Sequence, residues 1–168
     1  MQDKNVNMEK QFDSKDISFM EEAIRLADES VKNGGGPFGA VIVKDGEIIA
    51  GSSNSVTLDN DPTAHAEVNT IRQACRELNT FDLSGCVIYS SCEPCPMCLG
   101  AIYWARIGRI YYGNTRKDAA DIGFVDNFIY EELDRPLDKR TLPIIRMAGD
   151  KAYRTFKLWN EKQDKTEY

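Results

Sequence analysis

Histidine is nearly absent from this sequence: of 168 residues, only His65 carries an imidazole. Any metal site that needs an imidazole nitrogen must therefore use His65, and sites with two or more histidines are excluded. Basic residues are also in deficit, with 21 Lys and Arg against 27 Asp and Glu and a formal net charge of −6. No basic stripe of the kind that binds a phosphate backbone is evident, which argues against a nucleic-acid partner and favours a small molecule.

Long apolar runs are missing as well, since no stretch approaches the roughly 20 apolar residues of a membrane-spanning helix. Residues 1–15 alternate charged and amide side chains and lack the apolar centre of a secretory signal. We interpret them as a flexible N-terminal extension and expect residues 16–168 to form one domain. The protein is expected to be cytoplasmic, with no membrane partner.

The cysteines are too few and too unevenly placed for a disulfide framework. Of five, three crowd into the segment SCEPCPMC (residues 91–98), whereas Cys75 and Cys86 stand in apolar surroundings. An odd count with such clustering is typical of metal binding in a reducing compartment.

Within that segment, Cys95 and Cys98 have the spacing that lets two thiolates bind one metal ion. With His65 they make three protein ligands, which for tetrahedral Zn²⁺ leaves one position for water. Glu67, two residues after the histidine, is placed to act as a general acid and base beside that water. Together, HAE and PCPMC match H-x-E…P-C-x-x-C, the signature of zinc-dependent nucleobase deaminases.

Apolar periodicity predicts how these motifs are placed. Asp61 or Thr63 is suited to cap the helix that contains the HAE motif, and the turn KDGE at 44–47 predicts a hairpin. Alternating helices and short strands indicate an α/β layer structure with a mainly parallel sheet and one antiparallel edge strand. Helices are expected over residues 17–31, 64–78 and from the cysteine segment to 104, and strands over 38–43, 48–50, 86–89 and 109–112.

Beyond residue 113, helices, strands and turns follow one another in a less regular pattern. A short helix is expected near residues 127–133 and a longer one over 152–162, in which aromatic residues recur at a spacing of three. The segment LPII at 142–145 is interpreted as an edge strand, because Pro143 cannot donate to a ladder.

The residues around the cysteines predict how the ligands are held. Pro94 and Pro96 suit a chain entering a helix, which puts both thiolates in a first turn where the helix dipole favours the anion. On a regular helix, residues two apart point about 200° away from each other. His65 and Glu67 therefore share a site only if both lie at the tip of their helix, and we expect two helix N-termini to face one zinc ion.

Other interpretations of the cysteines explain less of the sequence. An iron–sulfur motif would put its next ligand at Ile102. A structural zinc site with four thiolates would need a cysteine from apolar surroundings, and a redox dithiol would leave His65 and Glu67 without a role. Cys92 is expected to be a small buried residue, since three ligands are already assigned. A zinc-binding scaffold without catalysis is the alternative in which Glu67 would be dispensable.

The sequence also resembles the cytidine deaminase-like superfamily from about residue 17 to its end, and within it looks like the bacterial guanine deaminases. The zinc segments are shared with transfer-RNA adenosine deaminases and small cytosine deaminases, so they indicate the reaction type alone. GFVDNFIY and the terminal EY are more selective, although Val125 stands where a second acid is expected. The resemblance is carried by residues 36–43, 60–67, 91–106, 123–130 and 167–168.

This resemblance implies a three-layer α/β/α fold around a five-stranded mixed sheet. It also implies a homodimer in which the segment of about residues 137–168 swaps across, so that Tyr168 from the swapped tail and Trp104 across the dimer close the pocket. One Zn²⁺ per subunit would serve a purine substrate. Guanine would be converted to xanthine and ammonia, with Zn-bound water attacking C2 and Glu67 as the proton shuttle. Guanosine or another nucleobase or nucleoside is the nearest alternative, and adenosine in transfer RNA is a more distant one.

The resemblance also implies which residues bind the purine. Asn54 would hydrogen-bond it, Phe38 would pack against its face, and the backbone N–H of Ala66 would contact it. Asp126 would meet N1–H and the exocyclic amine, for which a carboxylate is a matched double acceptor. An asparagine can both donate to and accept from a purine edge, and an aromatic ring stacks on any base.

Overall fold

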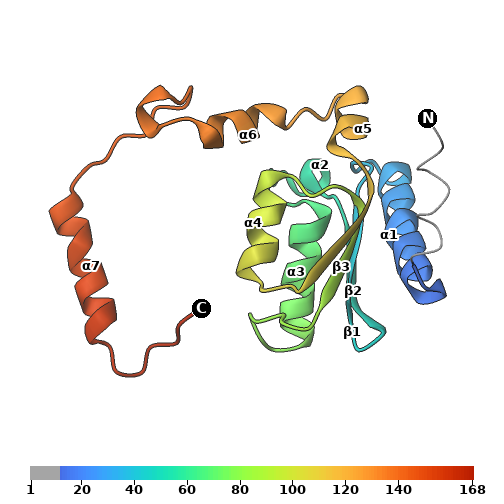
Figure 1. Ribbon diagram of the computed structural model, residues 1–168, viewed down its shortest axis with the longest axis horizontal. Helices are drawn as coiled ribbons and strands as arrows, with labels where there is room; N and C mark the ends of the chain where they lie inside the picture. Colours follow the sequence, from blue (N-terminus) through green and yellow to red (C-terminus); the bar gives the residue numbers. More distant parts are fainter. Residues whose placement is uncertain (1–11) are drawn as a thin grey trace, which may run out of the picture. The chain divides into compact units, whose positions relative to one another are not determined.

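The computed structural model describes residues 12–168, which divide into two units, one ending at Asp126 and one running from Asn127 to Tyr168. The expected N-terminal extension falls largely on residues 1–11, which lie outside the described ones. The sheet and all the buried residues belong to the first unit (Figure 1). Among the described residues, no helix combines the length and the apolarity needed to cross a membrane.

A four-stranded sheet forms the centre of the first unit, in the order β2-β1-β3-β4. β1 pairs antiparallel with both β2 and β3, and β3 pairs parallel with β4. The strands are β1 (Gly39–Lys44), β2 (Glu47–Ser53), β3 (Val87–Cys92) and β4 (Arg109–Asn114).

The reversed strand is an interior one. Asp45 and Gly46 both have positive φ, 53° and 81°, as a two-residue hairpin turn requires, and β1 and β2 join there as expected. β2, β3 and β4 run in one direction, and β1 lies between β2 and β3 against them. The expectation of a mainly parallel sheet with one antiparallel edge was therefore wrong. Burial patterns identify a strand but not its direction, and β1 is buried along nearly its whole length.

Helices cover both faces of this sheet. α1 (Ser14–Lys32) packs on one face, where Ala23 contacts a cluster that includes Val41 and Tyr89. α3 (Ala66–Glu77) and α4 (Pro96–Trp104) lie on the opposite face, as Figure 1 shows. The expected three-layer α/β/α class is confirmed. The core on the α3 and α4 side contains Ala40, Ile42, Ala50, Ala66, Ile71, Ala74, Leu83, Cys86, Ile88, Ile102 and Ala105.

Close contact between α1 and the sheet depends on Gly39 at the start of β1. A Cβ there would lie 2.6 Å from the backbone nitrogen of Ala27, so any larger residue would push the helix away. The Gly39 N–H donates to the hydroxyl of Ser91 on β3, at 3.0 Å. Helix, β1 and β3 are thereby held together beside the site.

The second unit carries no buried residue of its own. α6 (Asn127–Asp134) and α7 (Gly149–Glu161) confirm the two expected helices, with a 3₁₀ turn (Leu137–Lys139) after α6. Glu132 accepts hydrogen bonds from the backbone and hydroxyl of Thr141, both at 2.7 Å. The strand expected at 142–145 is absent from this described segment, so the sheet has four strands and not five. An apolar run forms a strand only beside a partner strand, and residues 142–145 pair with no other segment of residues 12–168.

Candidate metal centre and its pocket

His65 stands at the N-terminus of α3. It occupies the N-cap position, with φ −72° and ψ 153°, and its side chain makes no capping hydrogen bond. The expected cap by Asp61 or Thr63 was wrong, because Asp61 instead accepts from the backbone N–H and the hydroxyl of Thr63, both at 2.7 Å. The imidazole is therefore available to a neighbouring element.

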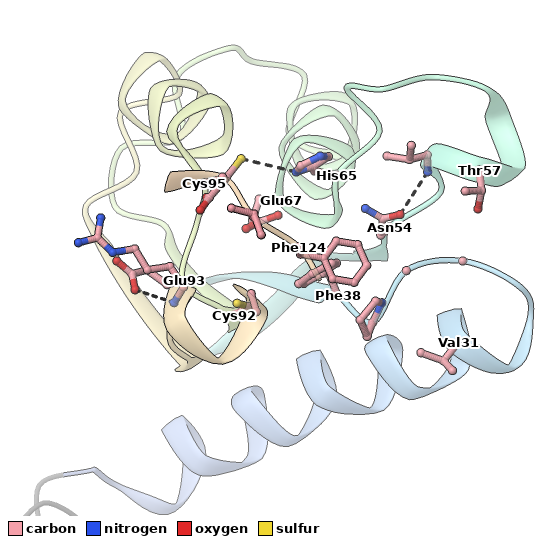
Figure 2. Close-up of a pocket in the computed structure, with 18 of the residues that line it drawn as sticks. Val31, Phe38, Asn54, Thr57, His65, Glu67, Cys92, Glu93, Cys95 and Phe124 are labelled. Carbon is pink, nitrogen blue, oxygen red and sulfur yellow. Dashed lines mark hydrogen bonds between the residues drawn. The ribbon is translucent and has the colours of Figure 1, made fainter. Parts of the chain in front are cut away.

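That neighbour is the N-terminus of α4. Cys95 is the N-cap of α4, Pro96 is its first residue, and Cys98 lies in its first turn. The His65 Nδ1 atom lies 3.6 Å from the Cys95 sulfur and 3.5 Å from the Cys98 sulfur. Figure 2 shows the His65 and Cys95 side chains directed at each other from the two helices. Two helix N-termini meet here, as the sequence predicts.

The three donor atoms fit a tetrahedral zinc ion. They all lie within 4.8 Å of one another. For ligands about 2.1 Å (nitrogen) and 2.3 Å (sulfur) from a tetrahedral centre, the expected nitrogen–sulfur separation is about 3.6 Å. The observed 3.5 and 3.6 Å agree with that value. Two thiolates and an imidazole are also a donor set that zinc prefers over harder cations.

Hydrogen bonding between the two thiols shifts their pKa values in opposite directions. A hydrogen bond from the Cys98 side chain, with a further one from His65, lowers the pKa of the Cys95 thiol to about 4. The same Cys95–Cys98 bond, together with burial, raises the pKa of Cys98. Cys95 likewise raises the pKa of His65. A metal bound by both sulfurs would require each of them to be deprotonated.

Glu67 lies beside this cluster, in the first turn of α3, with 6% of its surface exposed. Its Oε1 accepts a hydrogen bond from the Ser90 hydroxyl at 3.3 Å, and its Oε2 accepts one from the Cys98 thiol at 3.4 Å. Burial, with the negative charge of Cys95, raises the pKa of the Glu67 carboxyl. A carboxyl with a raised pKa next to a metal cluster is suited to accept a proton and return it.

A pocket of about 700 Å³ opens onto the cluster, within the roughly 300–1,000 Å³ typical of small-molecule sites. All of its lining residues belong to the first unit, and they include Phe38, Asn54 and Asp126. Three of the expected binding residues are thus brought to one cavity with His65, Glu67 and Cys95.

Asn54 is held in one orientation. It is 7% exposed, its Oδ1 accepts from the backbone N–H of Val56 at 3.3 Å, and its backbone carbonyl accepts from the Ser30 hydroxyl at 3.0 Å. In Figure 2 the amide nitrogen of Asn54 consequently points toward the centre of the pocket. Asn54 presents a donor to whatever the pocket holds.

The aromatic wall and the acid of the pocket lie nearby. The Phe38 ring meets Phe124 edge-on, with centroids 4.9 Å apart at 86°. Burial raises the pKa of Asp126, as does the nearby Cys95 thiolate. Glu93 accepts from the backbone N–H of Arg116 at 3.0 Å, which closes another side. Sequence reasoning did not identify Phe124, Glu93 or Arg116 as pocket residues, although Phe124 and Glu93 lie within the motifs it had singled out.

The remaining expected residues do not line this pocket. Ala66 is fully buried, and Trp104 is 70% exposed at the far end of α4. Tyr168 belongs to the second unit and is 72% exposed. The roles expected of these three stay predictions. Cys92 is 6% exposed, as expected for a small buried residue, and burial raises the pKa of its thiol to about 11.

Two thiolates and an imidazole, with a buried carboxyl and an open pocket beside them, define the class of zinc-dependent deaminases. Residues 13–114 match the family model of the cytidine and deoxycytidylate deaminase zinc-binding region. Guanine deaminase of Bacillus subtilis is 52% identical over 152 residues, which cover 90% of this chain and 97% of that protein. The chain belongs to the cytidine and deoxycytidylate deaminase family and, within it, to the guanine deaminases.

Solved structures agree with this placement. The match to the X-ray structure of the Bacillus subtilis guanine deaminase has a TM-score of 0.88 and covers 90% of this chain and 98% of the Bacillus subtilis chain. A guanine deaminase from Nitrosomonas europaea, at 28% identity, has a TM-score of 0.64 over 75% of this chain and 69% of its own. The tRNA-specific adenosine deaminase of Aquifex aeolicus is 42% identical over 67% of this chain and 75% of its own length. The similarity to the Bacillus subtilis enzyme therefore extends over more of this chain than the similarity to the RNA-acting relative.

Proposed function

We propose that this protein hydrolyses guanine to xanthine and ammonia, with Glu67 as the proton shuttle. The observation that carries the proposal is the buried Glu67 carboxyl beside the His65, Cys95 and Cys98 cluster, at a pocket that also holds Asn54. The choice of guanine is supported by the 52% identity to the Bacillus subtilis enzyme across nearly the whole of both chains.

His65, Cys95 and Cys98 would hold one zinc ion per subunit, since their donor atoms have tetrahedral spacing. When bound, zinc supplies a Lewis acid that makes water a better nucleophile near neutral pH. The two negative sulfurs cancel the charge of the ion, because the imidazole is neutral. The ion would therefore acidify water less than a zinc ion held by three histidines does. A base is then needed to take the proton of the attacking water, and Glu67 is the carboxyl placed for it.

The proton path follows from the bonding around C2 of guanine. Water adds to C2 while Glu67 takes one of its protons and passes it to N3, the ring nitrogen doubly bonded to C2. Glu67 then moves the second proton from the new hydroxyl to the exocyclic amine, which leaves as ammonia. C2 becomes a carbonyl, so one water is consumed and xanthine is formed. Because Glu67 is 6% exposed, these transfers occur away from bulk solvent.

Recognition of the base is assigned to three residues of the pocket. Asp126 would accept from N1–H and from the exocyclic amine before it leaves. Asn54 would donate its amide N–H to a purine acceptor, in the orientation that its bonds to Val56 and Ser30 impose. Phe38, fixed by Phe124, would pack against the ring face.

The second unit supports a homodimer in which residues from about 137 to 168 cross to a partner copy. It is short, none of its residues is buried, and α7 exposes Tyr153 at 58%, Phe156 at 71% and Trp159 at 43%. Apolar side chains in such number require a covering surface. We assign that surface to a second copy of this chain, with Trp104 and Tyr168 completing the pocket across the dimer.

The test of the substrate is ammonia release with product identification from guanine, guanosine, cytosine, cytidine and adenine. Xanthine formed from guanine, with little product from the others, is the expected result. Preferential turnover of another base would discard the roles of Asn54 and Asp126 and keep the metal centre.

The test of the shuttle is Glu67→Gln, which keeps the volume of the side chain and removes its basicity. We expect turnover to fall at least about 100-fold with the zinc content unchanged, in line with typical general-base contributions. Glu77→Gln, the same change at the exposed end of the same helix, is the matched control. Near-normal turnover by Glu67→Gln would contradict the assigned role and favour a non-catalytic zinc site.

A further inference from the structure

Ser90 places a hydroxyl in an otherwise apolar part of the sheet. It lies in β3, is 2% exposed, and pairs in register with Ala40 of β1 and Tyr112 of β4. Its side chain shares the α3 face of the sheet with Ile88, two residues earlier, because alternate residues of a strand face the same way. Within residues 12–168, its hydroxyl has one hydrogen-bond partner, the Oε1 atom of Glu67 at 3.3 Å.

A buried hydroxyl at this position needs an explanation. Moving a hydroxyl out of water costs free energy unless a hydrogen bond replaces the lost hydration. Alanine or valine would fill a strand interior without that cost. The 3.3 Å separation of the two oxygens is longer than the roughly 2.5–3.0 Å of a typical O–H···O bond, and hydrogen bonds of catalytic groups are often long without substrate and tighten when it binds.

The second partner of the Glu67 carboxyl is a candidate metal ligand. Oε2 of Glu67 contacts the Cys98 sulfur at 3.4 Å, so this oxygen is the one beside the candidate metal ligands. The Ser90 hydroxyl contacts the other oxygen, Oε1, from β3. This bond can therefore hold one oxygen of the carboxyl in place, while Oε2, beside the metal cluster, is left to exchange protons with the reactants.

We propose that Ser90 is a positioning residue, whose hydroxyl fixes Oε1 of Glu67 so that Oε2 faces the reacting atoms. The proposal rests on the proposed function of Glu67. It assigns Ser90 no contact with substrate or metal. Its whole effect passes through the Glu67 carboxyl, and that property separates it from ordinary packing.

Ser91 offers a matched control in the same strand. It is 5% exposed, it faces α1 from the other side of the sheet, and its hydroxyl accepts from the Gly39 N–H at 3.0 Å. Removing this hydroxyl leaves a buried N–H without its partner, so Ser91→Ala should lower stability. It should leave kcat within about twofold of the wild-type value, because the Ser91 hydroxyl bonds to Gly39 on the face of the sheet opposite to Glu67.

The experiment compares Ser90→Ala, Ser91→Ala and Ser90→Thr for kcat, KM, zinc content and thermal unfolding. Loss of a hydrogen bond to a charged group predicts a fall in kcat of about 10- to 100-fold for Ser90→Ala. KM should stay within about threefold, since substrate binding does not use this bond. Zinc content should be unchanged, and Ser90→Thr, which keeps the hydroxyl, should recover most of kcat.

A double-mutant cycle makes the test decisive. If Ser90 acts through Glu67, then Ser90→Ala should have almost no further effect on the residual rate of Glu67→Gln. An equal loss in both backgrounds would show a packing effect and overturn the proposal, as would a Ser90→Ala variant with normal kcat.

Failure of the proposed function gives a different result, because it is measured on the wild-type protein. If the wild type prefers another base, the comparison is made with that base and still tests Ser90. If the wild type releases ammonia from none of the five compounds, both proposals are overturned.

Discussion

Replacing Gly35 by alanine tests how the pocket holds Asn54. Gly35 follows α1 in the loop that forms one wall of the pocket. A Cβ on Gly35 would lie 2.6 Å from the backbone oxygen of Asn54 and nearer still to the Ser30 hydroxyl, closer than real Cβ contacts. The φ of Gly35 is not in the left-handed region, so alanine is excluded by contact and not by backbone strain. The loop or Asn54 must move to admit the methyl group.

The magnitude follows from what the methyl group meets. Overpacking a well-packed region costs about 1–3 kcal/mol, and one of the two contacts here is with backbone that cannot rotate away. A cost of about 2 kcal/mol corresponds to a fall in Tm of roughly 4–8 °C for a chain of this size. Ser30→Ala alone removes its hydrogen bond to Asn54 and should cost about 1 kcal/mol. In the double variant one contact is relieved, so its cost should be less than the sum of the two.

Calorimetry and steady-state kinetics with guanine give the two readouts. Because Asn54 is displaced while Glu67 and the metal ligands are not, KM should rise about tenfold and kcat should change much less. The Ser30→Ala variant is the control for loss of the hydroxyl without the added methyl group. A Gly35→Ala variant with the wild-type Tm and the wild-type KM would refute the described packing of Gly35 against Asn54.

Two further predictions concern α4 and the tail. Apart from its chain neighbours and its own helix backbone, no atom of residues 12–168 lies within 4 Å of the place where a Cβ on Gly100 would stand, so Gly100→Ala should raise stability by about 0.5–1 kcal/mol, measured as a higher Tm. A lower Tm would show that another chain approaches α4 at that point. Deleting residues 167–168 should reduce kcat/KM about tenfold while the Tm changes by less than about 2 °C, because an exposed terminus contributes little to folding. Small and equal losses in both quantities would mean that Tyr168 is ordinary surface.

The metal cluster could be predicted from sequence because its geometry is local. Cys95 and Cys98 are fixed by Pro96 and a single helical turn, and His65 by the start of α3. The sequence predicted both helix starts to within about two residues, which is sufficient for three ligands. Only their meeting in space depends on the rest of the fold.

The features that were predicted wrongly depend on relations between distant segments. The direction of β1 is set by which strand lies beside it, and an apolar run such as GAVIVK gives no sign of that. Residues 142–145 have strand propensity, but pairing requires a neighbouring strand, and the part of the chain that the structure describes supplies none. Ser90 was overlooked because a serine at the end of an apolar run is ordinarily interpreted as the edge of a strand, and its contact with Glu67 spans 23 residues.

The meeting of two helix N-termini has a consequence for the response of the site to salt. The anionic form of Cys95 is favoured by hydrogen bonds from the Cys98 side chain, from His65 and from the backbone N–H of Cys98 in the first turn of α4. Mobile ions screen charges that water surrounds far more than buried ones. Rising ionic strength should therefore weaken a surface pair such as Lys117–Asp121, whose side chains are 79% and 62% exposed, well before it affects the ligands. Hydrogen bonds of short range thus hold the Cys95 sulfur and the Glu67 carboxyl in one acidic protein, and salt leaves these bonds in place.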